Sequence, residues 1–255
     1  MRKLISTPLK QWDQYLIIAS LVALAWVYLL MLNNNMQDMS NMVPSIHPWT
    51  PAEFVMMFLM WAIMMFAMMV PSAMRAILIF ARIGPSAGQE HLVVTPAFVF
   101  TLGYIVIWTL FSVMATVLQW ALEMAVLLSP MMVVTSGSLG AALLIAAGLY
   151  QLTPLKDACL KHCQSPAMFM ATHYRKGLRG AFQLGLTHGA FCLGCCWLLM
   201  GLLFVGGVMN LIWILAISLF VLTEKLLPPK IHSRSVTSFF MIALGSVYLV
   251  LLPMQ

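Results

Sequence analysis

Long apolar runs alternate with short polar connections along the chain. About seven runs can be separated, at residues 15–32, 52–70, 96–120, 132–152, 181–205, 211–227 and 236–252. Crossing the hydrocarbon core of a bilayer takes about 20 residues of helix, and the runs are of that order. The pattern predicts an all-α, polytopic membrane helix bundle of about seven transmembrane helices, with residues 1–255 forming a single integral membrane domain.

Composition agrees with a protein surrounded by membrane lipid, because 62% of the residues are hydrophobic and 8% are charged. The formal charge of +6 does not indicate a nucleic-acid partner, since the basic residues lie in short connections between the runs. With seven spans and a cytoplasmic N-terminus, all 13 Lys and Arg residues fall on the cytoplasmic side or at that boundary. The positive-inside rule therefore predicts a cytoplasmic N-terminus, an outer C-terminus and a cytoplasmic segment at 153–179.

The fifth run carries one imidazole and three thiols between positions 188 and 196. His188, Cys192 and Cys196 are spaced i, i+4, i+8, so a helix places them on one stripe, and Cys195 leans to the same side. Thiolates and imidazole suit Cu(I), with Zn(II), an iron–sulfur cluster or another soft metal as alternatives. Cysteines also serve as small buried hydrophobes, and that interpretation stays open.

Methionines crowd the second run. Met60, Met64 and Met68 repeat at i+4 on one helical face, with Met69 beside them. Thioethers are soft ligands that select Cu(I) over harder divalent ions, so this face is a second candidate for metal binding. Methionine is also a flexible core filler, which is the competing interpretation.

A second pair of thiols lies in the polar segment at 153–179. Cys159 and Cys163 are spaced i, i+4, so one helical turn brings both to one side, with His162 as a third donor. In a reducing cytosol they are expected to stay thiols, which favours metal handling over a disulfide. Lys156 and Lys161 nearby favour the thiolate form. A coincidental pair of surface cysteines is the alternative.

Charged residues near the ends of the runs call for separate expectations. Lys225 is expected to snorkel to the interface, while Glu224 faces the bundle and neutralises an Arg or orients His188. Glu123 is assigned an interfacial role, and His173 is expected to be an ordinary solvated residue.

Three blocks of sequence between residues 51 and 228 carry a family resemblance. They read Trp61-x2-Met64-x2-Ala67-Met68-Met69-x-Pro71-Ser72, Gly148-x-Tyr150-Gln151-x2-Pro154-x-Lys156-x2-Cys159-Leu160-x2-Cys163-x-Ser165-Pro166, and His188-Gly189-x2-Cys192-x-Gly194-Cys195-Cys196-Trp197-x2-Met200. Together they resemble the bacterial predicted metal-binding integral membrane protein family, which includes a membrane copper-delivery partner of a bacterial tyrosinase. The resemblance implies a multi-pass protein of the bacterial inner (cytoplasmic) membrane that binds copper and supplies it to a cuproenzyme client.

These observations predict a membrane protein that binds Cu(I) and delivers or transfers it through Cys, His and Met ligands. Cys159 and Cys163 would exchange the ion at the cytoplasmic face, the cluster on the fifth run would hold it, and the methionine face would offer weaker sites. No catalytic residues are predicted, and no P-loop for self-powered pumping is visible. Two rivals stay open, a membrane thiol–disulfide oxidoreductase using the Cys-x2-Cys spacing and an accessory or assembly subunit of a larger membrane complex.

Overall fold

The computed structural model describes residues 11–39, 49–86, 95–129, 132–226 and 233–251. These ranges contain ten helices and, apart from one isolated bridge between Leu128 and Val134, no β-structure. The helices are α1 (Gln11–Met39), α2 (Pro51–Ser86), α3 (Thr95–Met124), α4 (Gly137–Gln151), α5 (Pro154–Gln164), α6 (Pro166–His173), α7 (Gly177–Gly201), α8 (Leu203–Gly206), α9 (Leu211–Leu226) and α10 (Ser233–Leu251). The predicted all-α class is confirmed.

Four stretches are long and apolar enough to cross a membrane: Leu16–Asn33, Pro51–Arg82, Pro96–Met124 and Gly177–Gly206. Helices α4 and α5 pass the same test only as a pair bent by 67°, which gives five when the pair is counted as one span. Helix α9 and the apolar part of α10 are shorter. Each of the seven predicted runs coincides with a helix, but length and composition of the described residues support four or five spans.

Helix α2 is longer than the run that predicted it. The predicted run closes at about residue 70, whereas α2 continues through Pro71 to Ser86. Proline removes one backbone donor from the helix. Just before it, the Met69 carbonyl accepts hydrogen bonds from Ser72 Oγ at 2.8 Å and from Tyr104 Oη at 3.0 Å. Neighbouring side chains therefore supply polar contacts where the helix passes the proline.

The polar segment at 153–179 folds into two short helices. Thr153 caps α5 by accepting a hydrogen bond from the Lys156 N–H, and Pro154 occupies the first turn, where its missing donor costs nothing. Pro166 starts α6 in the same way. Helix α5 packs directly against α7, so this segment is part of the bundle.

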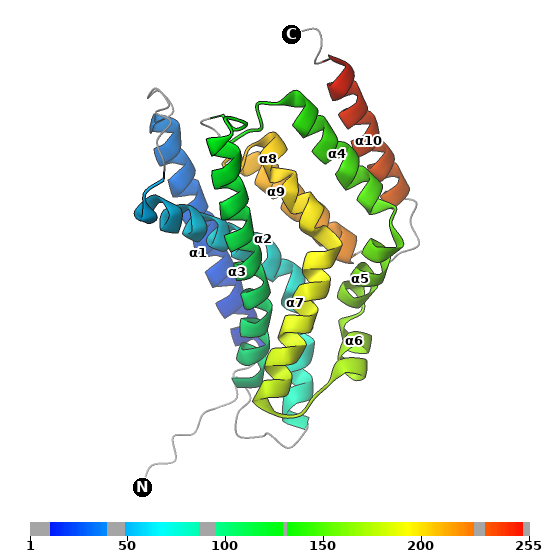
Figure 1. The fold of residues 1–255 in the computed structure, drawn as a ribbon. Coiled ribbons are helices and arrows are strands. Elements are labelled where there is room, and N and C mark those ends of the chain that lie inside the picture. The colour runs from blue at the N-terminus through cyan, green and yellow to red at the C-terminus, as the bar shows by residue number, and fades with distance from the viewer. Residues whose placement is uncertain (1–10, 40–48, 87–94, 130–131, 227–232, 252–255) are drawn as a thin grey trace.

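Helices α3 and α7 lie side by side at the centre of the bundle (Figure 1). Helix α2 packs against α3, and α1 packs against the outer side of α2. On the other side α4 pairs with α10, while α5 and α6 continue downward beside α7. Helix α9 contacts both α2 and α7, which brings its C-terminal end close to the thiol-bearing helix.

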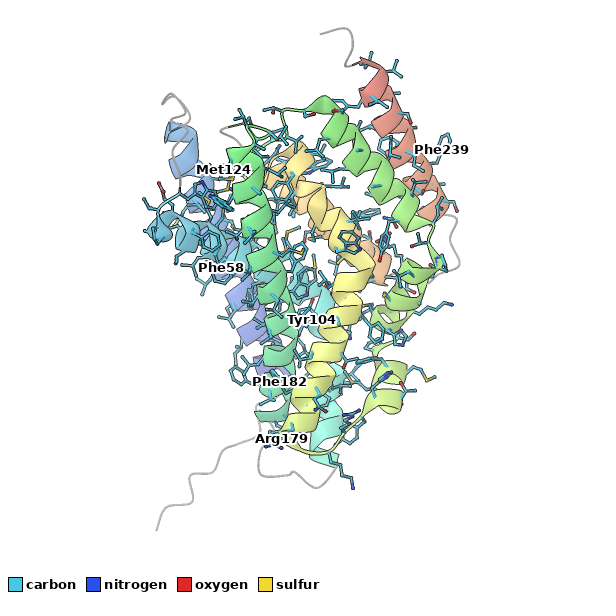
Figure 2. All side chains as sticks on the ribbon, in the orientation of Figure 1. Phe58, Tyr104, Met124, Arg179, Phe182 and Phe239 are labelled. Carbon is cyan, nitrogen blue, oxygen red and sulfur yellow. The ribbon has the colours of Figure 1, made fainter. Side chains whose placement is uncertain are left out.

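Polar and apolar side chains are arranged as expected for a bundle in an apolar solvent. Large apolar side chains such as Leu16, Ile212 and Phe239 are exposed, and Phe239 projects outward in Figure 2. Ser112 and Thr116 are fully buried and donate to carbonyls one turn earlier in α3. Extended apolar surface of this kind marks contact with a membrane or a partner, and the long apolar helices are compatible with membrane association.

Glycines allow α3 and α7 to approach closely. A Cβ atom on Gly185 would collide with the backbone of Phe100, and one on Gly103 would collide with the backbone of Phe182. Helices α4 and α10 approach closely in the same way at Gly148 of α4, whose carbonyl accepts from Ser238 Oγ of α10. Small residues at helix crossings bring backbones together in the same way in membrane helix bundles.

Gly185→Ala is expected to destabilise the bundle by roughly 1–3 kcal/mol, because the added methyl group forces two backbones apart. Thermal unfolding in detergent measures the effect as a lower Tm. Gly201→Ala is the matched control on the same helix, since no atom lies within 4 Å of its added Cβ. Equal Tm values for the two variants would contradict the close α3–α7 contact.

Candidate metal centre

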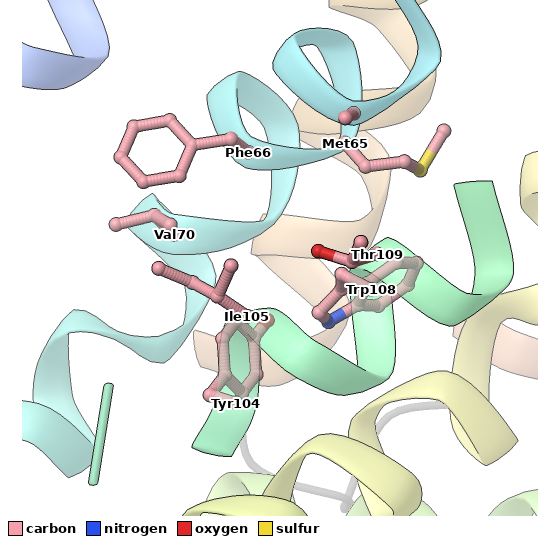
Figure 3. Close-up of a pocket in the computed structure, with 8 residues that line it drawn as sticks. Met65, Phe66, Val70, Tyr104, Ile105, Trp108 and Thr109 are labelled. Atoms are coloured by element: carbon pink, nitrogen blue, oxygen red, sulfur yellow. The ribbon is translucent and has the colours of Figure 1, made fainter. Parts of the chain in front are cut away.

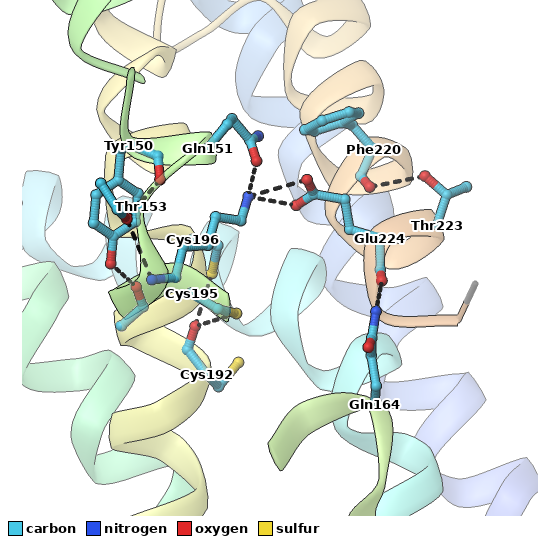
Figure 4. Close-up of polar contacts among 12 residues, drawn as sticks. Tyr150, Gln151, Thr153, Gln164, Cys192, Cys195, Cys196, Phe220, Thr223 and Glu224 are labelled. Atoms are coloured by element: carbon cyan, nitrogen blue, oxygen red, sulfur yellow. Dashed lines mark hydrogen bonds and ion pairs between the residues drawn. The ribbon is translucent and has the colours of Figure 1, made fainter. Parts of the chain in front are cut away.

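All five cysteines of the chain lie on α5 and α7, which pack against each other. Cys192, Cys195 and Cys196 are buried at 1–2% exposure, so the predicted stripe faces the bundle interior (Figure 4). The two thiols of α5 were expected at a separate cytoplasmic location. The structure instead brings both groups of thiols together at one helix crossing.

Gly194 allows α5 to lie this close to α7. The Cys159 sulfur lies 2.8 Å from the position that a Cβ atom on Gly194 would take, so no larger residue fits there without a shift. One turn further along α5, the Cys163 thiol lies close enough to interact with the thiols of Cys192 and Cys195. Sulfur atoms from two helices therefore converge on Cys192.

The Cys192 sulfur also contacts two polar groups from other helices. Lys225 Nζ of α9 donates to it at 2.9 Å, and Tyr104 Oη of α3 lies 3.1 Å from it. Lys225 Nζ donates in addition to Ser72 Oγ of α2 at 2.9 Å. An ammonium group beside a thiol favours the thiolate, which is the form that binds metal ions.

The expectation that Lys225 snorkels to the interface is wrong. Its side chain is 4% exposed and points inward at Cys192. Glu224 faces the bundle as expected, but it pairs with Lys156 of α5, whose Nζ lies 2.8 and 3.0 Å from the two carboxylate oxygens. Lys156 also donates to the Gln151 side-chain oxygen, and this network fastens α5 to α9 beside the thiols (Figure 4).

His188 lies one turn before Cys192 in a box of aromatic rings. The ring centroids of Phe100, Tyr104 and Phe169 are 5.4 to 5.9 Å from its own. The side chain is buried, and its Nδ1 has no hydrogen-bond partner among the described residues. A buried polar atom without a partner costs free energy, and this nitrogen is available to a proton or a metal ion.

His162 of α5, predicted as a third donor beside the α5 thiols, lies against Phe191 of α7. Its ring stacks on Phe191 with centroids 4.1 Å apart, and Nδ1 is within hydrogen-bond distance of the Ala158 carbonyl at 2.8 Å. His173 is exposed, as expected for a solvated residue, although its ring lies 6.0 Å from that of His162.

The predicted methionine face of α2 is buried. Met60, Met64, Met68 and Met69 are each at most 2% exposed. The thiols of α5 and α7 around Cys192 are called the thiol cluster below. Helix α2 reaches this cluster at Met69, which accepts from Tyr104, and at Ser72, which accepts from Lys225. Further along, α2 and α3 enclose a cavity of about 20 Å³ beside Tyr104, Met65 and Trp108, which is large enough for one water molecule (Figure 3).

Residues 58–248 match the PpoB2 family of copper chaperones. The chain belongs to this family. The matched region contains all five cysteines, His188 and the methionine face of α2. The resemblance to a copper-delivery family is thereby confirmed, and the protein has a copper-related function. Neither the curated proteins nor the solved structures contain a match to the chain.

In the structure, two of the α7 thiols are hydrogen-bonded to the backbone. Among the described residues, no group of three or more His, Cys, Asp or Glu side chains is arranged as a ready metal site. One reason is local, since the thiols of Cys195 and Cys196 both donate to the Cys192 carbonyl at 3.0 Å. Rotation of these side chains between staggered rotamers would redirect the sulfurs from the backbone toward a bound ion.

Three residues at this centre were not recognised from the sequence. Tyr104 lies in an apolar run without any distinguishing spacing, and Ser72 resembles an ordinary helix hydroxyl. Lys225 gave a signal, because a lysine preceded by a long apolar run is rare, but its position near the helix end favoured the interface.

Removing the cation that pairs with Glu224 is expected to destabilise the protein strongly. Lys156→Met leaves a buried carboxylate without its ammonium partner, at a cost of about 3–5 kcal/mol. The double variant Lys156→Met with Glu224→Leu should recover most of that loss in thermal unfolding. Lys161→Met, at an exposed position on the same helix, is the control. Additive losses in the double variant would show that the pair is not coupled.

Proposed function

We propose that the protein binds Cu(I) at the crossing of α5 and α7 and delivers it to a cuproenzyme client. The observation that carries this proposal is the convergence of the thiols of both helices around Cys192, in a chain that belongs to a copper chaperone family. Thiolate sulfur is the ligand type that selects Cu(I) from other available ions.

The proposed ligands are those that lie closest to this crossing. Cys163 and Cys192 contact each other across the two helices, and Cys195 contacts Cys163 from the next turn of α7. The remaining proposed donors are Cys159, Cys196 and His188, which lie on the same two helices. Binding then requires that the thiols lose protons and turn away from the Cys192 carbonyl.

The charge of Lys225 favours a monovalent ion at this position. Two thiolates, one ammonium and one Cu(I) sum to zero, whereas a divalent ion with the same groups leaves one net positive charge. Uncompensated charge in a buried site carries a large desolvation cost. Lys225 is buried against Cys192, so the balance of charges supports Cu(I) over Zn(II).

The methionine face of α2 provides the proposed route away from the thiols. Met60, Met64, Met68 and Met69 are buried along one helix whose Met69 end lies at the thiol cluster. Neutral thioethers hold Cu(I) less tightly than thiolates, and passage between sites requires binding weak enough to permit release.

Metal analysis of the purified protein tests the proposed thiol ligands. Wild type is expected to hold copper with a sulfur-rich X-ray absorption spectrum, and Cys192→Ser with Cys195→Ser is expected to lose most of it. Ala190→Ser, at an exposed position on the same helix, should keep the wild-type content. Unchanged copper in the double cysteine variant would refute the ligand assignment, and zinc in place of copper would refute the preference for Cu(I).

We further propose that residues 1–255 form one integral domain that crosses the bacterial cytoplasmic membrane seven times, with the N-terminus inside. The distribution of the 13 basic residues supports this orientation. The apolar composition of α9 and α10 supports two crossings beyond the longer helices, with α4 as a third.

Reporter fusions test this topology directly. A fusion after Lys176 is expected to be active only with a cytoplasmic reporter, because the segment before α7 carries several basic residues. A fusion after Gly207 should be active only with an external reporter. The reverse pattern at both positions would refute the orientation, and the same side for both would refute α7 as a crossing.

A further inference from the structure

A second group of soft ligands lies near the C-terminal end of α3, away from the thiols of α5 and α7. Gln119 is fully buried there, near the end marked by Met124 in Figure 2. Its side-chain nitrogen lies 3.4 Å from the sulfur of Met132, 3.8 Å from the sulfur of Met57 and 2.9 Å from a carboxylate oxygen of Glu123. Three acceptors from three parts of the chain thus surround one donor.

The nature of these acceptors points to a cation. An amide NH2 group carries partial positive charge, and thioether sulfur is a weak hydrogen-bond acceptor. The two thioethers are soft ligands of the kind that bind Cu(I), and the carboxylate adds a negative charge beside them. The side-chain amide of Gln119 occupies the position that such an ion would take, and its terminal torsion is a soft one.

The surrounding residues hold the carboxylate and the amide in place. Glu123 accepts a hydrogen bond from Trp49 Nε1 at 2.8 Å through its second oxygen. The Gln119 side-chain oxygen accepts from Trp61 Nε1 at 2.7 Å. Outer partners of this kind orient the ligands of metal sites in proteins. Glu123 is partly buried one residue before the end of α3, where an interfacial role was expected, and its carboxylate also contacts Gln119.

The backbone at Met132 is held in an unfavourable conformation. Its φ is 56°, in the left-handed region that residues other than Gly and Asn seldom adopt. The Met132 N–H donates to the Ser129 carbonyl, and the Ser129 N–H donates to the Val133 carbonyl, so the residue occupies a turn position typical of glycine. A thioether at this position is directed onto Gln119 at the expense of backbone strain.

We propose that Met57, Met132 and Glu123 form a second site for Cu(I). The carboxylate would neutralise the ion, and two neutral thioethers would hold it less tightly than the thiols do. As a delivery site it depends on the proposed function, since copper would reach it from the thiol cluster. As a binding site it stands on the geometry around Gln119 alone.

The two sites are connected along α2 and α3. Tyr104, at the thiol cluster, and Gln119 are separated by about 22 Å along α3 at a rise of about 1.5 Å per residue. On α2 the corresponding contacts are Met69 and Trp61, and the buried Met64 and Met68 lie between them. Buried thioethers of α2 thus lie between the thiol-rich site and the thioether-rich one.

Silver(I) is a suitable probe because it is a soft monovalent ion that does not change oxidation state in the assay. The starting protein is full-length and carries Cys159→Ser, Cys163→Ser, Cys192→Ser, Cys195→Ser and Cys196→Ser, which removes all five thiols of the chain. This protein is expected to bind silver, and adding Met57→Leu with Met132→Leu should weaken binding about tenfold or more. Met56→Leu is the matched control, because its side chain is 64% exposed on the same helix.

Two further variants separate loss of a ligand from loss of the fold. Glu123→Gln keeps the shape of the side chain and removes its charge, so silver binding should weaken while size-exclusion behaviour is unchanged. Met132→Gly relieves the left-handed backbone and removes the sulfur, so it should also weaken silver binding. Silver affinity unchanged in Met57→Leu with Met132→Leu, or retained in Met132→Gly, would overturn the proposed site.

The outcomes for the two proposals can be told apart. If wild type holds copper through its cysteines but the methionine variants leave silver affinity unchanged, the second site is refuted and the proposed function stands. If cysteine substitution leaves the copper content unchanged while silver binding still depends on Met57 and Met132, the thiol assignment is refuted and the second site stands.

Discussion

The contact between a buried ammonium group and a cysteine sulfur organises the centre of this bundle. Lys225 comes from α9 and Cys192 from α7, while Tyr104 of α3 and Ser72 of α2 complete the contact. Four helices therefore meet at one polar point inside an otherwise apolar core. A buried charge without polar partners carries a large desolvation cost. The four helices must therefore be rotated so that these polar groups face one another.

The two buried lysines are compensated in different ways. Lys156 has a carboxylate partner in Glu224, and this pair is neutral without any further group. Lys225 has hydroxyl and sulfur partners but no carboxylate among the described residues. The natural counter-charge for Lys225 is a thiolate at Cys192. The same interaction that stabilises the fold therefore prepares a ligand for a soft cation.

Local periodicity predicted much of the fold, and long-range packing supplied the rest. The i, i+4, i+8 spacing of His188, Cys192 and Cys196 identified the inward stripe of α7, because helical geometry alone decides which residues share a face. The docking of α5 on α7 could not be predicted in this way. This docking depends on the contact of Gly194 with Cys159 and on the ion pair between Lys156 and Glu224. In both contacts the two residues lie far apart in the sequence.

Gly103 of α3 and Gly185 of α7 set the distance between these two helices near Cys192. Gly103 immediately precedes Tyr104, and Gly185 lies two turns before Cys192 on α7. Backbone contact at these glycines sets the separation of the helix axes and hence of the tyrosine oxygen and the sulfur. The contact of Tyr104 with the Cys192 sulfur therefore depends on the distance between α3 and α7. A movement that separates these helices would remove this contact and change how strongly the sulfur binds a metal ion.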